Sequence, residues 1–108
     1  MDGVLVHSTE RKWAPLPYGK GVSLSSLLPN GRGGGWALLR FEPRSKFPAH
    51  DHPGGEEVYV IEGSLRIGKE TLRAGDYLWT PPGGIHDAES EQGCTLFLSA
   101  PEGIKVLD

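Results

Sequence analysis

The fold of this 108-residue chain is decided by residues 47–63, Phe47-Pro-Ala-His50-Asp-His52-Pro-Gly-Gly-Glu56-Glu57-Val-Tyr-Val-Ile-Glu-Gly63. Side chains alternate between the two faces of a strand, so His50 and His52 can point at one locus. Pro53-Gly-Gly is typical of a turn or bulge, and Glu56, which begins the next strand, can face the same locus. Two imidazoles and a carboxylate that converge indicate a transition-metal site.

A candidate for a fourth ligand lies in a second motif, Gly75-Asp-Tyr-Leu-Trp-Thr-Pro81-Pro-Gly83-Gly-Ile-His86. A predicted strand over residues 76–80 ends at the Pro-Pro-Gly-Gly turn, which sets where the next strand begins and where His86 points. We therefore expect His50, His52, Glu56 and His86 to hold one divalent metal. Glu57 is the alternative carboxylate ligand, because a bulge at the preceding glycines could exchange the two strand faces.

Short strands separated by turns account for the rest of the chain. Sixteen Gly and nine Pro are spread along it, and no segment carries a helical period over several turns, which argues against a helical bundle. Strands are expected at residues 4–7, 22–28, 36–42, 57–62, 65–67, 71–73, 76–80, 94–100 and 104–107. Pro43 is expected to end one strand before a connector over 44–48, and Gly63-Ser64 to form a turn. This pattern predicts an all-β sandwich or barrel, whose interior is where ligands from different strands can meet.

The length of the chain predicts one domain, with residues 1–21 an amino-terminal strand and arm and residues 22–108 the barrel. Trp13 and Tyr18 are expected to attach the arm to the barrel. A net charge of −3 without a cluster of Lys and Arg argues against nucleic acid or an anionic membrane as partner.

The chain has one cysteine, Cys94, so an internal disulfide is excluded, and we expect a buried thiol and a cytoplasmic location. No apolar run is long enough for a transmembrane helix, and the first residues lack the pattern of a signal peptide.

The two motifs resemble those of the cupin superfamily. The first cupin motif, G-x5-H-x-H-x3,4-E-x6-G, matches His50-x-His52-x3-Glu56-x6-Gly63, with Arg44 in place of its opening glycine. The second, G-x5-P-x-G-x2-H-x3-N, matches Gly75-x5-Pro81-x-Gly83-x2-His86, with Ser90 in place of its closing asparagine. The resemblance implies a small cupin double-stranded β-helix, or jelly-roll barrel, in which three histidines and one glutamate bind the metal.

A closer resemblance, over most of residues 13–100, is to the ChrR-like cupins, which include the cupin half of a zinc-dependent anti-sigma factor. It rests on Leu39-Arg-Phe41, Phe47-Pro-x-His50-x-His52, Gly55-Glu-Glu57, Ala74-Gly-Asp-Tyr77 and Pro81-Pro-Gly83. In that relative the matching residues hold zinc. The sequence has no separate helical region and no His-x3-Cys-x2-Cys motif, so capture of a sigma factor is not implied. Other ChrR-like cupins are small iron dioxygenases that cleave carbon–carbon bonds in diketones or aromatic ketones.

Three functional interpretations follow. The first is a metal-binding module that senses or binds a small ligand, with zinc the expected metal and iron, manganese or nickel as alternatives. The second is a metal-dependent dioxygenase acting on a diketone or aromatic ketone, and the third, weaker one is a sugar or hydroxy-acid isomerase. An accessible pocket above the metal would favour an enzyme, whereas a closed site without a cavity would favour the module.

Two residues are expected to line such a pocket, Phe97 and Trp36, although packing in the core is the simpler role for both, as it is for Tyr59 and Trp79. His7 is expected to be a surface histidine. Pairing of edge strands could also join two chains into a homodimer, with the amino-terminal arm as the exchanged element.

Overall fold

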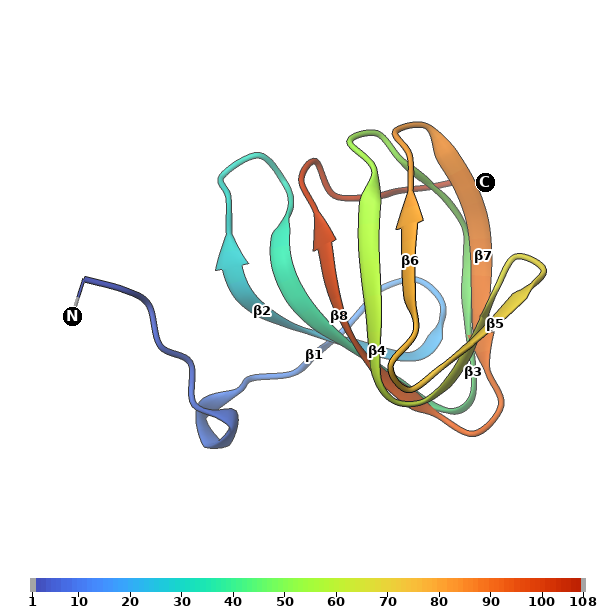
Figure 1. Ribbon diagram of the computed structural model, residues 1–108, viewed down its shortest axis with the longest axis horizontal. Helices are drawn as coiled ribbons and strands as arrows, with labels where there is room; N and C mark the ends of the chain where they lie inside the picture. The colour runs from blue at the N-terminus through green and yellow to red at the C-terminus, as the bar shows by residue number, and fades with distance from the viewer. Residues whose placement is uncertain (1, 108) are drawn as a thin grey trace.

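The computed structural model describes residues 2–107, and these fold almost entirely into strands (Figure 1). The strands are β1 (Ala14–Pro15), β2 (Lys20–Pro29), β3 (Gly35–His52), β4 (Glu56–Ile67), β5 (Glu70–Arg73), β6 (Tyr77–Thr80), β7 (Gly84–Ser90), β8 (Cys94–Ala100) and β9 (Lys105–Val106). Within the described part, one 3-10 turn, η1 (Ser8–Glu10), precedes them. No helix among these residues is long and apolar enough to cross a membrane.

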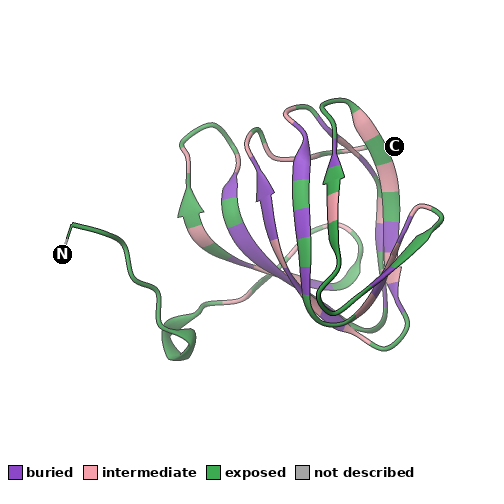
Figure 2. Cartoon of the chain, in the orientation of Figure 1, coloured by how far each residue is buried: buried purple, intermediate pink, exposed green. Residues whose placement is uncertain are grey.

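The strands close into a ring because β3 and β4 each pair with both β7 and β8. The first half of β3 lies between β2 and β8, and its second half pairs with β7 and β9. The two long strands therefore belong to both walls, and buried and exposed segments alternate along them (Figure 2). Their inward side chains and those of the neighbouring strands form one apolar core, in which Val60, Leu65 and Leu96 are almost fully buried. The predicted all-β jelly-roll barrel is confirmed.

Strand β3 is longer than the sequence indicated. We expected a strand over 36–42 that ends at Pro43 and a connector over 44–48, but β3 continues to His52. Residues 42–44 have no partner in the register, because the strand there leaves β8 and joins β7. A proline without an N–H costs no ladder hydrogen bond at this crossing. The crossing is bent by Arg44, whose φ is 59°, and its N–H donates to the carbonyl of Glu91.

Strand β4 likewise runs through the turn expected at Gly63-Ser64. Gly63 has a φ of 79°, and it bends the strand where pairing with β8 gives way to pairing with β5 and β7. Gly68-Lys69 forms a two-residue hairpin turn, as a Gly-X pair between two strands predicts, since Ile67 pairs with Glu70.

The amino-terminal arm is attached where expected, but it has no strand at residues 4–7. Trp13 stacks on the guanidinium of Arg40 at 3.8 Å, and Tyr18 meets Phe47 edge to face at a centroid distance of 5.3 Å. Residues 4–7 lie in solvent without a partner strand, and an isolated strand has no ladder to stabilise it (Figure 2). His7 is exposed, as expected.

Gly63 provides a test of the bend in β4. A Cβ at this position would lie against the Gly93 carbonyl oxygen and the Cys94 backbone, at a φ that L-residues disfavour. Gly63→Ala should therefore cost about 2–5 kcal/mol of unfolding free energy, measured by urea denaturation. The matched control is Gly68→Ala, where φ is 60° but nothing lies within 4 Å of the added Cβ; this change should cost about 1–2 kcal/mol. Equal losses in both variants would contradict the close approach of β4 to β8.

Candidate metal centre

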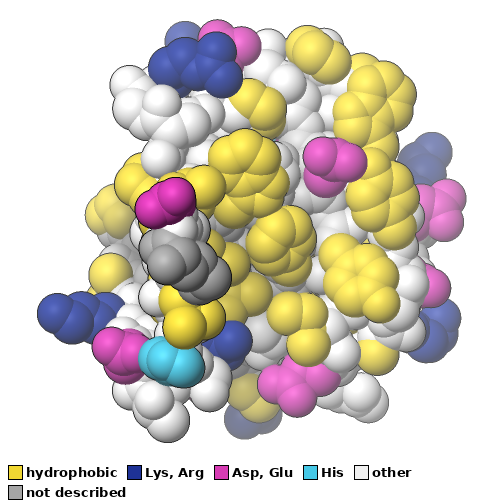
Figure 3. Space-filling model, turned by 60° about the vertical axis from the view of Figure 1, so that its left-hand side comes forward, with side chains coloured by type: hydrophobic (Ala, Val, Ile, Leu, Met, Phe, Trp, Pro, Cys, Tyr) yellow, Lys and Arg dark blue, Asp and Glu magenta, His cyan; other side chains and the backbone are white. Residues whose placement is uncertain are grey.

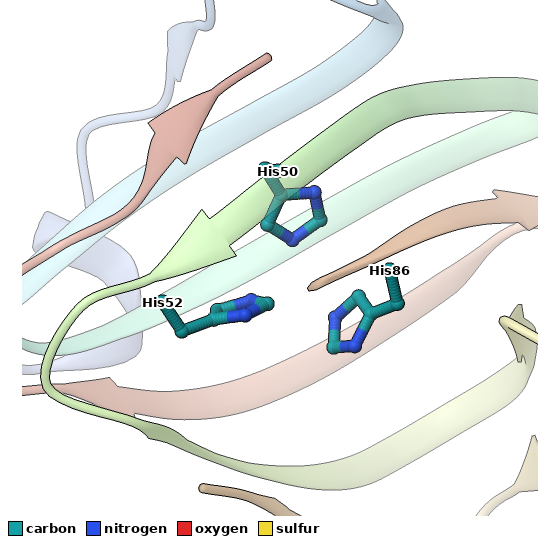
Figure 4. Close-up of side chains that lie close together, drawn as sticks. All are labelled: His50, His52 and His86. Atoms are coloured by element: carbon teal, nitrogen blue, oxygen red, sulfur yellow. The ribbon is translucent and has the colours of Figure 1, made fainter. Parts of the chain in front are cut away.

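Three histidines meet inside one end of the barrel (Figure 4). His50 and His52 are alternate residues at the end of β3, and His86 lies on β7 directly opposite His50 in the antiparallel register. The three ring centroids are 4.4–4.9 Å apart, and each ring offers one nitrogen within 4.8 Å of the others. The turn after β6 aims His86, because the Gly83 and Gly55 amides both donate to the His52 carbonyl, at 2.9 and 3.0 Å.

Backbone carbonyls orient two of the imidazoles. His50 Nδ1 lies 2.8 Å from the carbonyl oxygen of Pro48, and His52 Nδ1 lies 2.7 Å from that of Gly84. A carbonyl only accepts, so in each ring Nδ1 carries the proton and donates it. In the neutral ring Nε2 is then the atom with a free lone pair. This tautomer is the one in which a metal-binding histidine presents Nε2.

The carboxylate of Glu56 joins this cluster. Its Oε1 lies 3.3 Å from His52 Nε2 and 3.8 Å from His86 Nε2, and its side chain is 7% exposed. Glu57 faces the other side of β4, where its carboxylate accepts a hydrogen bond of 2.7 Å from the Tyr77 hydroxyl. Strand alternation thus brings Glu56, and not Glu57, to the histidines.

Burial controls the charge of the cluster. Burial lowers the pKa of His50, and burial together with the charge of His52 lowers the pKa of His86 to about 4. Burial also acts to lower the pKa of His52, but the adjacent Glu56 carboxylate outweighs it, and the net shift is upward. At neutral pH two of the imidazoles are therefore neutral and able to donate a lone pair to a metal.

One buried atom of the cluster lacks a hydrogen-bond partner. His52 Nε2 is inaccessible to solvent, and its 3.3 Å contact with Glu56 does not have hydrogen-bond geometry, although the carboxylate still acts on it through its charge. A buried polar atom without a partner is costly unless something binds it. Three imidazole nitrogens and a carboxylate oxygen around that atom suit a divalent transition metal, so the residues present fit such an ion.

A cavity of about 480 Å³ leads from this cluster to the surface. His50, Glu56 and His86 line its inner end. The remaining lining is mostly apolar and comes from the inward faces of β2, β3, β4, β7 and β8, and it includes Leu24, Leu39, Phe41, Phe47, Val58, Leu65, Ile67, Leu96 and Leu98. The centre is therefore accessible to a small molecule rather than closed off.

Of the two expected pocket residues, only Trp36 lines the cavity. Phe97 does not belong to the lining, because its neighbours Leu96 and Leu98 point inward and strand alternation turns Phe97 outward. The expectation of a core role was also wrong for Trp36, Tyr59 and Trp79, which are 43%, 47% and 58% exposed. Tyr59 and Trp79 lie on the outer faces of β4 and β6, which contribute their opposite faces to the core.

Sequence reasoning missed the small residues that make room for the cavity. Gly35 and Ala100 are register partners on β3 and β8, and with Ala37 they line the cavity. The sequence does contain a sign of this space, because a small residue at an inward position of a buried strand leaves room that a larger residue would fill.

A jelly-roll barrel with converging histidines at one end of an internal cavity defines a cupin. The chain belongs to the ChrR cupin-like domain family, whose model matches residues 1–102. The DNA damage-repair/toleration protein DRT102 of Arabidopsis thaliana is 32% identical over an alignment of 69 residues, which covers 58% of this chain. The match spans only 22% of the plant protein, so about four fifths of that protein has no counterpart here.

Solved structures with the same fold include two proteins named for enzymes. A candidate acetylacetone dioxygenase of Methylibium petroleiphilum is 19% identical and superposes with a TM-score of 0.89, over all of this chain and 83% of that one. The polyketide cyclase RemF of Streptomyces resistomycificus is 21% identical, with a TM-score of 0.81 over 96% of this chain and 84% of that one. At these identities the likeness establishes the fold.

Substitution of the two adjacent glutamates distinguishes the candidate ligands. Glu56→Gln should lower the metal content of the purified protein, because it removes the charged oxygen nearest His52, whereas Glu57→Gln should leave metal content near that of the unsubstituted protein. Elemental analysis by mass spectrometry measures both. The reverse result would assign the ligand to the next residue and would contradict the inward orientation of Glu56.

Removal of His52 should lower metal content and melting temperature together. If His52→Ala weakens binding about a hundredfold, metal that had been saturating at a hundred times its Kd contributes about 2.3 kcal/mol less to stability. Scanning calorimetry with and without a chelator separates the metal contribution from packing, since the difference between the two melting temperatures should shrink in the variant. An unchanged difference would show that the metal binds elsewhere.

Proposed function

We propose that this domain is a metal-dependent oxygenase that binds a small, largely apolar molecule through oxygen atoms placed on the metal. His50, His52, Glu56 and His86 would hold one divalent ion, and the bound ion would supply a site for chelation and for activating dioxygen. The observation that carries the proposal is the open cavity that ends at three of these four residues. A site that only stored a metal would need no such access.

The chemistry of the walls favours a diketone or aromatic ketone as substrate class. Apolar side chains exclude water and accept a hydrocarbon group, while the only charged lining residue is the Glu56 carboxylate at the inner end. A 1,3-diketone has two oxygens that can chelate one ion and apolar ends that suit such walls. Its cleavage by dioxygen gives a carboxylic acid and a 1,2-dicarbonyl compound, and both atoms of dioxygen enter the products, so no external reductant is consumed.

The same walls argue against a sugar or hydroxy-acid isomerase. Apart from the centre itself, the side-chain hydrogen-bonding groups of the lining are those of Tyr18, Ser26 and Trp36. Several hydroxyl groups of a sugar would be buried without partners, at a cost of about 1–3 kcal/mol each. A ligand-sensing module has the support of the family to which the chain belongs, and it would use the same cavity without turnover.

Metal analysis followed by oxygen consumption tests the proposal. We expect iron, or a manganese or nickel ion, in the protein as purified from cells, and uptake of one dioxygen per β-diketone consumed in an oxygen-electrode assay. Zinc has no redox chemistry, so tightly held zinc without oxygen uptake, including after replacement by Fe(II), would overturn the oxygenase and leave the ligand-binding module.

The cavity itself can be filled by substitution. Ala100→Leu places a larger side chain between Gly35 and the metal centre, so binding of acetylacetone to the metal-loaded protein should weaken about tenfold, or about 1.4 kcal/mol, by calorimetric titration. Metal content should be unchanged, because Ala100 is not a candidate ligand. The matched control is Ala74→Leu, at an exposed turn position, which should bind acetylacetone normally. Unaltered binding in Ala100→Leu would exclude this cavity as the ligand site.

A further inference from the structure

The amino-terminal arm supplies one of the few polar groups in the cavity lining. Outside the metal centre, the lining has hydrogen-bonding side chains only at Tyr18, Ser26 and Trp36. Ser26 is exposed and Trp36 is 43% exposed, so water competes for the hydrogen bonds of both. Tyr18 is partly buried and packs against the apolar core, so it is the polar lining residue outside the centre that is best shielded from water.

The surroundings of Tyr18 are apolar. Figure 3, which looks from the side of the arm, shows hydrophobic side chains gathered across this face. Among residues 2–107, the hydroxyl of Tyr77 donates a hydrogen bond of 2.7 Å to Glu57, whereas the hydroxyl of Tyr18 has no hydrogen-bond partner. A hydroxyl group both donates and accepts, so that of Tyr18 is available to a polar group of a ligand.

Backbone contacts on both sides hold Tyr18 in place. The Leu16 N–H donates to the Val22 carbonyl at 2.9 Å, which attaches the arm to β2. Gly19, with a φ of 80°, lies so close to β3 that an added Cβ would be 2.7 Å from the Lys46 carbonyl oxygen. Residues 16–19 therefore bridge β2 and the second half of β3. A side chain fixed in this way loses little freedom when a ligand binds.

Two ring contacts lead from Tyr18 to the metal centre. The Tyr18 ring meets Phe47 edge to face at a centroid distance of 5.3 Å, and Phe47 meets His50 edge to face at 4.7 Å. Tyr18 therefore stands one aromatic ring away from the centre. The cavity of about 480 Å³ is in the range that holds a drug-sized molecule, so a diketone with two methyl ends would leave much of it unfilled.

We propose that the Tyr18 hydroxyl hydrogen-bonds a polar substituent at the end of the ligand that lies away from the metal. The site would then prefer an aryl diketone with a ring hydroxyl to the same diketone without it. A phenol ring attached to the diketone carries its hydroxyl one ring away from the chelating oxygens, and Tyr18 likewise stands one ring away from His50. This inference rests on the proposed function, because it requires the other end of the ligand to be chelated at the centre.

Calorimetric titration of the zinc-loaded protein tests this preference without turnover, since zinc has no redox chemistry. The ligands are 1-phenylbutane-1,3-dione and its 3-hydroxyphenyl and 4-hydroxyphenyl analogues. We expect at least one analogue to bind about fivefold more tightly than the parent diketone. Tyr18→Phe removes the hydroxyl and keeps the ring beside Phe47, so the parent should bind as before and the preference should disappear. Comparing the two proteins cancels any effect of the ring hydroxyl on the acidity of the diketone itself.

Two control variants separate this role from a general effect of a lost hydroxyl. Tyr59→Phe, on the outer face of β4, and Ser26→Ala, the other hydroxyl of the lining, should both keep the preference. The inference is overturned by equal affinities in the unsubstituted protein or by a preference that persists in Tyr18→Phe. It is also overturned if Tyr18→Phe weakens the parent and its analogues equally, because that result indicates a structural role.

Acetylacetone distinguishes failure of this inference from failure of the proposed function. If acetylacetone binds the zinc-loaded protein and neither hydroxylated analogue is preferred, the assignment of Tyr18 is wrong while chelation at the centre stands. If neither acetylacetone nor any of the three aryl diketones binds, the proposed function and this inference are both overturned.

Discussion

The antiparallel pairing of β3 with β7 is the constraint on which the site depends. It places His50 opposite His86, and the two-residue period of β3 then adds His52 on the same side. A shift of the register by one residue would turn a whole set of side chains to the other face of the sheet. The hydrogen bonds of the Gly55 and Gly83 amides to the His52 carbonyl oppose that shift, because they join the turns of both motifs at a single acceptor.

This geometry brings polar side chains together inside the barrel, where water solvates them poorly. The charges of these side chains reflect that cost. Burial lowers the pKa of His50 and of His86, while Glu56 places a negative charge 3.3 Å from Nε2 of His52 and 3.8 Å from Nε2 of His86. Neutral imidazoles and a carboxylate together solvate a divalent cation well, but they solvate one another poorly, as the unpartnered Nε2 of His52 shows. A metal would resolve both problems, since it accepts the free lone pairs and balances the carboxylate.

Much of this arrangement could be predicted from sequence, because it depends on local spacing. The positions of His50, His52 and Glu56 follow from strand alternation across a glycine turn, and the hairpin at Gly68 follows from the preferences of its backbone. The continuity of β3 through Pro43 could not be predicted in this way. It depends on an exchange of neighbouring strands that no local window contains, and at that crossing the proline has no ladder bond to lose.

The outward aromatic residues were misjudged for a related reason. Tyr and Trp are residue types that often occur in cores, but Tyr59 and Trp79 lie on the face of their strands that points away from the core. Residue type alone does not tell which face of a strand is covered. Phe97 was assigned to the pocket against its own alternation with Leu96 and Leu98. In each case the alternation of side chains along the strand was the better guide to which face of the sheet the residue occupies.

The apolar cavity links the metal centre to the rest of the barrel. A barrel of this size must either fill its interior or leave it open, and Gly35, Ala37 and Ala100 leave it open beside the histidines. Apolar walls exclude water from the approach to the centre, which strengthens every electrostatic interaction there. In the described part of the chain, β1 pairs with β2 only at Ser23 and Leu24, so no further strand lies beside residues 25–29 of β2. Leu24, Ser26 and Pro29 of this strand also line the cavity, so a change at this edge of the sheet would alter a wall of the ligand site.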